Sequence, residues 1–177
     1  MTEKKEKILH TALQLFASNG YNATSTAQIA KLAEVSEGLI FRHFSSKKGL
    51  LDYIYEEMEQ KTAQILAPIL ATKDPKETIR LSIDFPFTHL VGENYHYWRL
   101  LFRLKWQEGY DASENMHPLR ERLHKAFEEL GYDHPALETQ LLERTVDGIA
   151  TTVMLTNIED QLPLRAFLFK KYNLITD

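Results

Sequence analysis

The sequence contains no cysteine. A disulfide framework and a thiolate metal site are therefore both excluded. No apolar run approaches the roughly 20 residues that a membrane-spanning helix needs. The N-terminal stretch MTEKKEKILH is charged and then amphipathic, which is not the pattern of a secretory signal peptide. These absences lead us to expect a soluble, cytoplasmic protein with no membrane partner.

Sequence motifs for catalysis are also missing. The seven histidines are scattered without the spacing of metal ligands, and there is no H-E-x-x-H, no phosphate-binding loop and no nucleophile elbow. We therefore expect no enzymatic activity, no catalytic residue, no metal and no cofactor. An enzyme on a helical scaffold is the least favoured alternative.

The alternation of apolar and polar residues that predicts β-strands is lacking as well. Apolar residues instead recur at helical spacing along most of the 177 residues, and 44% hydrophobic residues are enough for a buried core. We predict an all-α fold with an N-terminal helix-turn-helix domain of three helices and a C-terminal helical body. The two domains are expected to span residues 1–46 and 47–177.

Local signals predict where the helices begin and end. Asn19-Gly20 should end the first helix, and Ser25 with Gln28 forms an S-x-x-Q capping box that starts the second. Pro86 should kink or end the helix in which it lies. Further helix starts are expected at Ser36, Ser45-Ser46, Asp74-Pro75, His117-Pro118, His134-Pro135 and Pro163.

The net charge of −4 is an average over two unlike parts of the chain. Residues 1–50 carry seven Lys and Arg against four Glu, a net +3, which leaves −7 for the rest. Phosphate binding depends on local charge, because salt limits the reach of a charge to about 10 Å. The asymmetry favours a basic, DNA-binding head on an acidic body. The alternative is that these charges only solvate helix faces.

Residues 25–51 carry the most informative pattern. Two short helices are predicted there, joined by a turn at Glu34-Val35 and followed directly by a longer helix. This arrangement suits the placement of the second short helix in the major groove of DNA. The helices that start at Ser25, Ser36 and Ser46 each present N–H groups and partial positive charge at their N-termini. Each is therefore expected to hold a phosphate.

The residues of this segment support a specific family resemblance. The pattern G-Y-x-A-T-S-x-x-x-I-A-x-x-A-x-V-S-x-G-x-x-F-x-H-F-x-S-K-x-x-L, within residues 5–51, resembles the DNA-binding domain of TetR-family transcriptional repressors. The later helices fit the helical regulatory domain of that family in number and order. The resemblance implies that double-stranded DNA is a partner.

The resemblance assigns roles along the second short helix. Arg42 is expected to pair with guanine in a bidentate manner, and Glu37 to accept from cytosine N4. Lys47 is similar to a family lysine that contacts the DNA backbone. His43 is expected to donate to a phosphate, or alternatively to pack on the next helix as a surface histidine. The expected DNA-binding residues are Ser25, Thr26, Ser36, Glu37, Gly38, Leu39, Phe41, Arg42, His43 and Lys47.

Several positions depart from the family pattern. Phe41 replaces a usual tyrosine and lacks its hydroxyl, so a weaker backbone contact is expected there. Leu39 replaces a small hydroxyl residue and offers only apolar contact to a thymine methyl. Glu34 stands where a turn glycine is common, and Ala27 where a basic residue is common. Phe44, by contrast, is expected in the core, beneath the DNA-reading helix.

One such head makes few contacts, so tight binding predicts a homodimer on a palindromic site with half-sites about 34 Å apart. The helix from Pro135 to about Asn157 is apolar over more than one stripe. It is expected to form the dimer interface with a last short helix, although a simple core role is the alternative. The apolar residues concerned are Leu137, Leu141, Leu142, Val146, Ile149, Ala150, Val153, Met154, Leu164, Phe167, Leu168 and Tyr172.

Aromatic residues are concentrated between residues 85 and 106. Such residues more often belong to an ordinary core, but the resemblance implies a small-molecule effector in this domain. The expected ligand-binding residues are Phe85, His89, Tyr95, Trp98, Phe102 and Trp106.

The sequence therefore predicts a dimeric transcriptional repressor that binds a palindromic operator. A small apolar or aromatic effector is expected to release it from the DNA. In the alternative, the helical body is a dimerisation or protein-interaction module without an effector.

Overall fold

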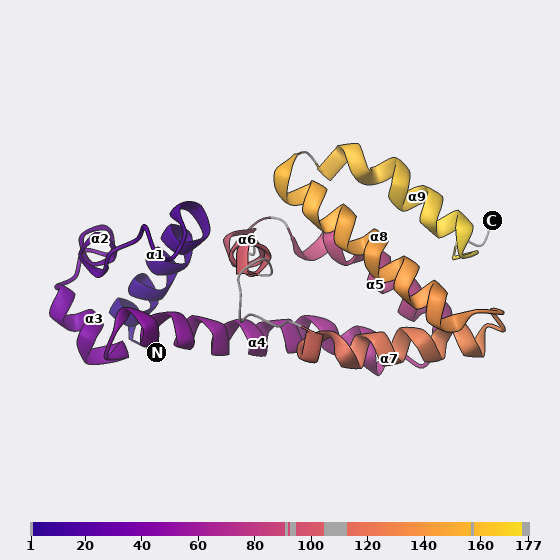
Figure 1. The fold of residues 1–177 in the computed structure, drawn as a ribbon, viewed down its shortest axis with the longest axis horizontal. Helices are drawn as coiled ribbons and strands as arrows, with labels where there is room; N and C mark the ends of the chain where they lie inside the picture. Colours follow the sequence, from indigo (N-terminus) through magenta and orange to yellow (C-terminus); the bar gives the residue numbers. More distant parts are fainter. Residues whose placement is uncertain (1, 91, 93–94, 105–112, 157, 175–177) are drawn as a thin grey trace. The chain divides into compact units, whose positions relative to one another are not determined.

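A computed structural model describes residues 2–90, 92, 95–104, 113–156 and 158–174 (Figure 1). Every regular element in these residues is a helix, which confirms the all-α prediction. Within them, no helix combines the length and apolar character needed to cross a bilayer. The elements are α1 (Glu3–Asn19), α2 (Thr26–Leu32), α3 (Glu37–Phe44), α4 (Lys47–Ala71), α5 (Pro75–His89), α6 (Tyr95–Leu104), α7 (Ser113–Glu129), α8 (Pro135–Leu155), η2 (Ile158–Gln161) and α9 (Leu162–Lys171).

The chain forms two compact units. Unit 1 comprises Met1–Thr62 and His96–Tyr110, and unit 2 comprises Ala63–Tyr95 and Asp111–Asp177. The boundary between them falls inside α4, whereas the predicted functional boundary at 46/47 stays a prediction.

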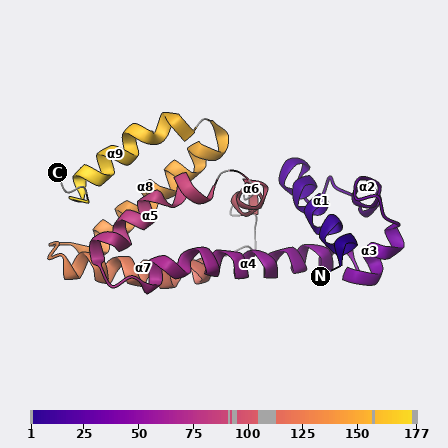
Figure 2. The same ribbon diagram turned by 180° about the vertical axis from the view of Figure 1, so that it is seen from behind.

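Unit 1 contains the helix-turn-helix segment. α2 contacts both α1 and α3, and Figure 2 shows the same three helices from behind. The predicted inward residues of α2 (Ile29 and Ala30) are buried, and so is Ala33, which follows them. The core of the head also includes Ile8, Ala12, Phe16, Ile40, Phe44 and Leu50.

Unit 2 is built on α5, α7 and α8. α7 packs against α5 and α8, α5 also contacts α8, and α9 packs against α5 and η2. A buried carboxylate ties α5 to α9, because Asp84 accepts hydrogen bonds from Arg80 at 2.8 Å and from Arg165 at 2.6 Å. The buried side chains of this unit include Ile79, Ile83, Leu123, Phe127, Leu142, Ile149, Leu168 and Tyr172.

Most predicted helix boundaries are confirmed. The Ser25 hydroxyl accepts from the Gln28 N–H while the Gln28 side chain accepts from the Ser25 N–H, which completes the capping box. The Ser46 hydroxyl accepts from the Gly49 N–H at the start of α4, and the Asp74 carboxylate caps α5. Gly20, with φ of 90°, follows the last residue of α1.

Ser36 occupies the N-cap position of α3, which confirms the predicted helix start, although its side chain makes no capping hydrogen bond. Two other local features differ from the prediction. α5 continues through Pro86 to His89, so Pro86 does not end the helix, and a kink at this residue stays a prediction. Burial of Pro86 in the core of unit 2 offsets the hydrogen bond that a proline removes. α7 begins at Ser113 and contains Pro118.

Candidate nucleic-acid interface

The turn between α2 and α3 holds the two helices at an angle. Glu34 adopts a left-handed conformation with φ of 56°, which costs free energy in a residue that carries a Cβ. The turn closes as the Val35 N–H donates to the Ala30 carbonyl over 3.0 Å. The glycine that is common at this position in the family would adopt this conformation without that cost. Glu34 is therefore held in a backbone conformation that is unfavourable for glutamate.

α3 presents one face to the core and the other to solvent. Ile40 is fully buried and Phe44 is 5% exposed, which confirms the prediction for Phe44. Phe41, in contrast, is 45% exposed, an unusual position for a large aromatic side chain. The remaining exposed side chains on this helix are Glu37, Arg42 and His43. Leu39 is half-buried, so it is less available for contact than predicted.

Two predicted DNA-binding residues interact with each other. The Thr26 hydroxyl, at the first residue of α2, donates to Glu37 Oε1 at the first residue of α3 over 2.5 Å. Both helix starts are thereby joined at the surface. The Glu37 carboxylate is consequently held in one place on the exposed face.

Two glycines of this region have different structural roles. A Cβ at Gly38 would meet no atom within 4 Å, so its lack of a side chain leaves open space at the start of α3. A Cβ at Gly49 would lie 2.1 Å from the Phe44 carbonyl oxygen. Only glycine therefore allows α4 to approach the end of α3 so closely. Sequence reasoning missed Gly49, because nothing in the K-x-G spacing indicates what its Cβ would meet.

The first residues of α4 carry two lysines with different partners. Lys48 is exposed and forms an ion pair with Asp52, whose hydrogen bond raises the pKa of Lys48. Lys47 is half-buried, and its Nζ lies 4.2 Å from the centroid of the Tyr21 ring. Tyr21 was not among the predicted site residues.

A second lysine in unit 1 lies against aromatic rings. Lys5 Nζ lies 3.8 Å from the centroid of the Tyr53 ring and 5.6 Å from that of Phe44, and the two rings pack edge to face. This arrangement fixes α1 against the ends of α3 and α4. Lys5 therefore contributes to packing of the head as well as to its positive charge.

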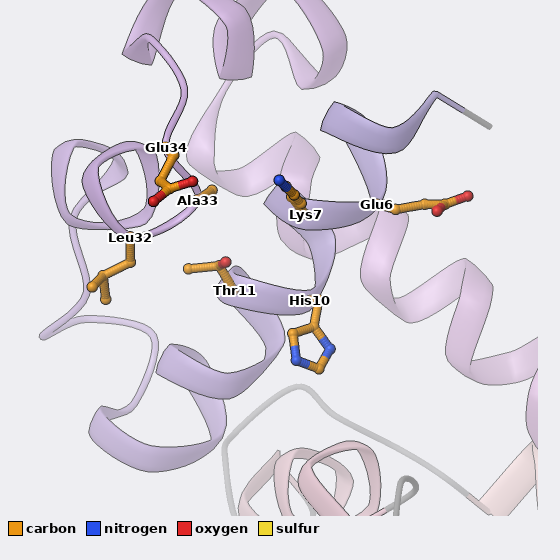
Figure 3. A pocket seen from close by; sticks show the side chains of 7 residues that line it. All are labelled: Glu6, Lys7, His10, Thr11, Leu32, Ala33 and Glu34. Carbon is orange, nitrogen blue, oxygen red and sulfur yellow. The ribbon is translucent and has the colours of Figure 1, made fainter.

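An open pocket of about 360 Å³ lies between α1 and the C-terminal end of α2 (Figure 3). It is lined by Glu6, Lys7, His10, Thr11, Leu32, Ala33 and Glu34. None of these is an expected ligand-binding residue, so the pocket does not correspond to the predicted effector site.

The expected ligand-binding residues fall on both units. In unit 2, the rings of Phe85 and His89 lie 5.4 Å apart, and the Tyr95 hydroxyl donates to the Met154 carbonyl over 3.3 Å. Burial lowers the pKa of His89. Trp98 and Phe102 belong to unit 1, and Trp106 lies outside the described residues.

The environment of Trp98 resembles ordinary core packing. Trp98 is buried, and its ring packs edge to face on Tyr97 at 4.9 Å. The Tyr97 hydroxyl bonds to Thr62 and to the Met58 carbonyl, which fixes α6 on α4 within unit 1. These contacts agree with the alternative that the aromatic residues belong to an ordinary core. Effector binding by Phe85, His89, Tyr95, Trp98, Phe102 and Trp106 stays a prediction.

The predicted dimer residues fall into three groups, of which the smallest, Val146 and Ala150, is half-buried. Six of them are buried within the chain: Leu142, Ile149, Val153, Met154, Leu168 and Tyr172. Four are exposed in the single chain: Leu137, Leu141, Leu164 and Phe167. Leu155 and Leu162, which the sequence did not single out, are exposed too. One face of α8 and α9 thus packs in the core of unit 2, and a second, apolar face is exposed in the single chain.

Comparison with known proteins shows which family the N-terminal segment resembles. The family described as "Bacterial regulatory proteins, tetR family" matches residues 8–54, the segment that holds α1 to α3 and the start of α4. This segment therefore matches the tetR family of bacterial regulators. The predicted resemblance is confirmed, and the relatives that carry the segment are transcriptional regulators.

Several curated regulators are similar to parts of the chain. The HTH-type transcriptional regulator QacR of Staphylococcus aureus is 47% identical over 57 residues, 32% of this chain and 30% of that protein. The Fatty acid metabolism regulator protein of Bacillus subtilis is 31% identical over 98 residues, 53% of this chain and 50% of that protein. The chain therefore spans at most half the length of these curated relatives.

Solved structures share the fold along nearly the whole chain. A TetR-like regulator from Rhodococcus sp. RHA1 has a TM-score of 0.73 at 22% identity, covering 93% of this chain and 92% of that one. The regulator FadR from Bacillus subtilis, solved in complex with stearoyl-CoA, has a TM-score of 0.66 at 23% identity, covering 94% and 96%. These likenesses show that α4 to α9 have the same fold as the helical bodies of such regulators.

Proposed function

We propose that this protein is a transcriptional repressor that binds a palindromic operator as a homodimer. The observation that carries the proposal is the exposed face of α3, where Phe41, Arg42 and His43 are open to solvent while Ile40 and Phe44 anchor the helix. A helix held in this way can enter the major groove without disturbing the core. A DNA-bound dimer would exclude polymerase, and we place it in the cytoplasm, with the DNA.

The geometry of the head supports a proposed role for several of its residues. Arg42 reads guanine, and Glu37, held by Thr26, accepts from cytosine. Gly38 leaves room for the DNA surface beside the start of α3. Lys47, with the capped N-termini of α2 and α4, binds phosphates. The proposed functional division remains a DNA-binding head of residues 1–46 and a regulatory body of residues 47–177.

The uncovered apolar face of α8 and α9 supports the dimer. Leu137 and Phe167 are each 61% exposed, and Leu155 is 74% exposed. Water-exposed leucine and phenylalanine side chains that gather on two helices are the usual mark of a protein interface. A second copy of this chain, related by a two-fold axis, would cover them and form a four-helix bundle.

The proposed regulation is release from DNA by a small apolar or aromatic effector bound in the helical body. Support comes from the aromatic content of α5 and α6 and from the shared fold with FadR of Bacillus subtilis, a regulator solved with stearoyl-CoA. The alternative is a body that only dimerises or binds proteins, which the core-like packing of Trp98 favours.

Selection of bound duplexes from a random DNA pool tests the proposal. Enrichment of a two-fold symmetric sequence at moderate salt is the expected result. A pool without symmetric enrichment would contradict the dimeric, sequence-specific proposal. With the selected duplex in hand, release by any member of a panel of acyl-CoA thioesters and aromatic cations supports the effector, and its retention against the whole panel favours the alternative.

A further inference from the structure

The contact between Tyr21 and Lys47 joins two parts of the head that are 26 positions apart in sequence. Lys47 is the first residue of α4, and Tyr21 lies in the loop between α1 and α2. The ammonium Nζ lies 4.2 Å from the ring centroid, well within the range in which an aromatic face attracts a cation. The lysine side chain is therefore held against the protein surface.

Tyr21 itself is held firmly. Its ring lies 5.3 Å from that of Phe16, which is fully buried in α1. Its carbonyl accepts from the Thr24 N–H over 3.2 Å. The buried Thr24 hydroxyl in turn donates to the Gly20 carbonyl over 2.9 Å. The ring is therefore a fixed platform, set by the α1–α2 loop.

The neighbouring lysine differs in its charge balance. Lys48 Nζ lies 2.7 Å from Asp52 Oδ2, so a carboxylate already accompanies this ammonium group. An aromatic face attracts a cation without carrying a net negative charge. The Lys47 ammonium is thus held at a fixed position at the start of α4 by a partner that is not an anion.

We propose that Tyr21 is a positioning residue for DNA binding, which holds the Lys47 ammonium where it meets a backbone phosphate. The inference rests on the proposed DNA-binding function and deepens it. A free lysine must lose side-chain mobility when it pairs with a phosphate, and this loss weakens binding. With Tyr21 in place, much of that mobility is already lost in the free protein. Tyr21 therefore strengthens binding without touching the DNA.

The proposal differs from a purely structural role for Tyr21. If the residue only packed on Phe16, its replacement would weaken DNA binding whether or not Lys47 were present. If it acts through Lys47, its effect disappears when that lysine is removed. A double-mutant cycle measures this difference directly.

The experiment uses the full chain and a labelled duplex of mixed sequence, titrated by fluorescence anisotropy at several salt concentrations. The variants are Tyr21→Leu, Lys47→Ala and the double variant, with Tyr21→Phe as the matched control that keeps the ring. Lys47→Ala should weaken binding and lower the salt dependence by about one released ion per head. Tyr21→Leu should weaken binding roughly two- to fivefold per head, and Tyr21→Phe should bind like the wild type.

In the Lys47→Ala background, Tyr21→Leu should cause no further loss. An equal loss in both backgrounds, or no loss in either, would overturn the role of Tyr21. A wild-type protein that binds no duplex would instead contradict the proposed DNA-binding function itself.

A second measurement needs no substitution that could disturb folding. The Tyr21 ring should shift the Lys47 Hε proton resonances upfield, both in the free protein and in the DNA complex. Resonances at ordinary lysine positions in the complex would also overturn the proposal.

Discussion

The Thr26 hydroxyl donates to Glu37 Oε1 over 2.5 Å, which links the first residue of α2 to the first residue of α3. The hydrogen bond fixes an exposed carboxylate on the DNA-reading helix. A carboxylate at this position repels phosphates unless it is directed at a base that donates. We therefore expect the hydrogen bond from Thr26 to Glu37 to affect which DNA sequence is bound more than it affects folding stability.

Thr26→Val should relax sequence preference at the base pair that Glu37 is proposed to read. Valine keeps the shape of threonine but cannot donate, so the Glu37 side chain regains its mobility. Because the pair lies at the surface, the free energy of unfolding should change by only about 1 kcal/mol or less. Affinities for a set of single-base variants of the selected operator check the prediction. Thr26→Ser is the matched control, and loss of preference in that variant would contradict it.

Arg42→Ala and Lys47→Ala should have different effects on DNA binding. The Arg42 variant should lose about 1–3 kcal/mol at one base pair and tolerate other bases there, because its proposed contact is to a base edge. The Lys47 variant should lose affinity for all sequences alike, because its proposed contact is to the backbone. Competition between specific and mixed-sequence duplexes measures both. Equal loss of specificity in the two variants would count against these roles.

Glu34→Gly should stabilise the protein by about 1 kcal/mol. The backbone φ of 56° at this position is unfavourable for glutamate and suits glycine. Chemical denaturation followed by circular dichroism gives the free energy of unfolding. Lys31→Gly is the matched control, since the same change within α2 should destabilise by about 1 kcal/mol. A destabilised Glu34→Gly variant would mean that contacts of the glutamate side chain outweigh the backbone cost.

Gly49→Ala and Gly38→Ala should separate folding from DNA binding. An alanine Cβ at Gly49 meets the Phe44 carbonyl oxygen, so this variant should be destabilised by about 3 kcal/mol. At Gly38 the Cβ enters open space, and stability should be unchanged or rise by up to about 1 kcal/mol. DNA affinity should nevertheless fall in the Gly38 variant, because the methyl group faces the groove. Unfolding curves and operator titrations of both variants check this.

Phe167→Glu should dissociate the proposed dimer. The side chain is 61% exposed on α9, so the folded single chain should tolerate a charge there while the covered interface should not. Sedimentation equilibrium measures the dissociation constant. The matched control is Leu32→Glu, at an equally exposed leucine of the head (62%). A variant at Phe167 that stays dimeric would place the interface elsewhere.

The local features of this fold could be predicted from sequence because each depends on neighbouring residues. The Ser25–Gln28 capping box needs only four consecutive positions. The burial of Ile29, Ala30 and Phe44 follows from helical periodicity and the family pattern.

Features that depend on the packing of distant segments could not be predicted from the sequence. The bond from Thr26 to Glu37 requires α2 and α3 to meet at their starts, and the Tyr21–Lys47 contact requires a loop to lie beside α4. The continuation of α5 through Pro86 reflects burial against other helices, which a local helix-breaking rule does not contain. For the same reason, the aromatic residues of α5 and α6 could not be divided between core and ligand site.

In the proposed function, a dimer of this chain reads a palindromic DNA sequence through α3. The most direct measurement is the affinity and stoichiometry of the purified protein for its selected palindrome, compared with the same duplex in which one half-site is scrambled, at moderate salt. Two chains should bind per palindrome, and affinity should fall strongly when either half-site is scrambled. Equal affinity for both duplexes, or one chain bound per duplex, would contradict the proposed function.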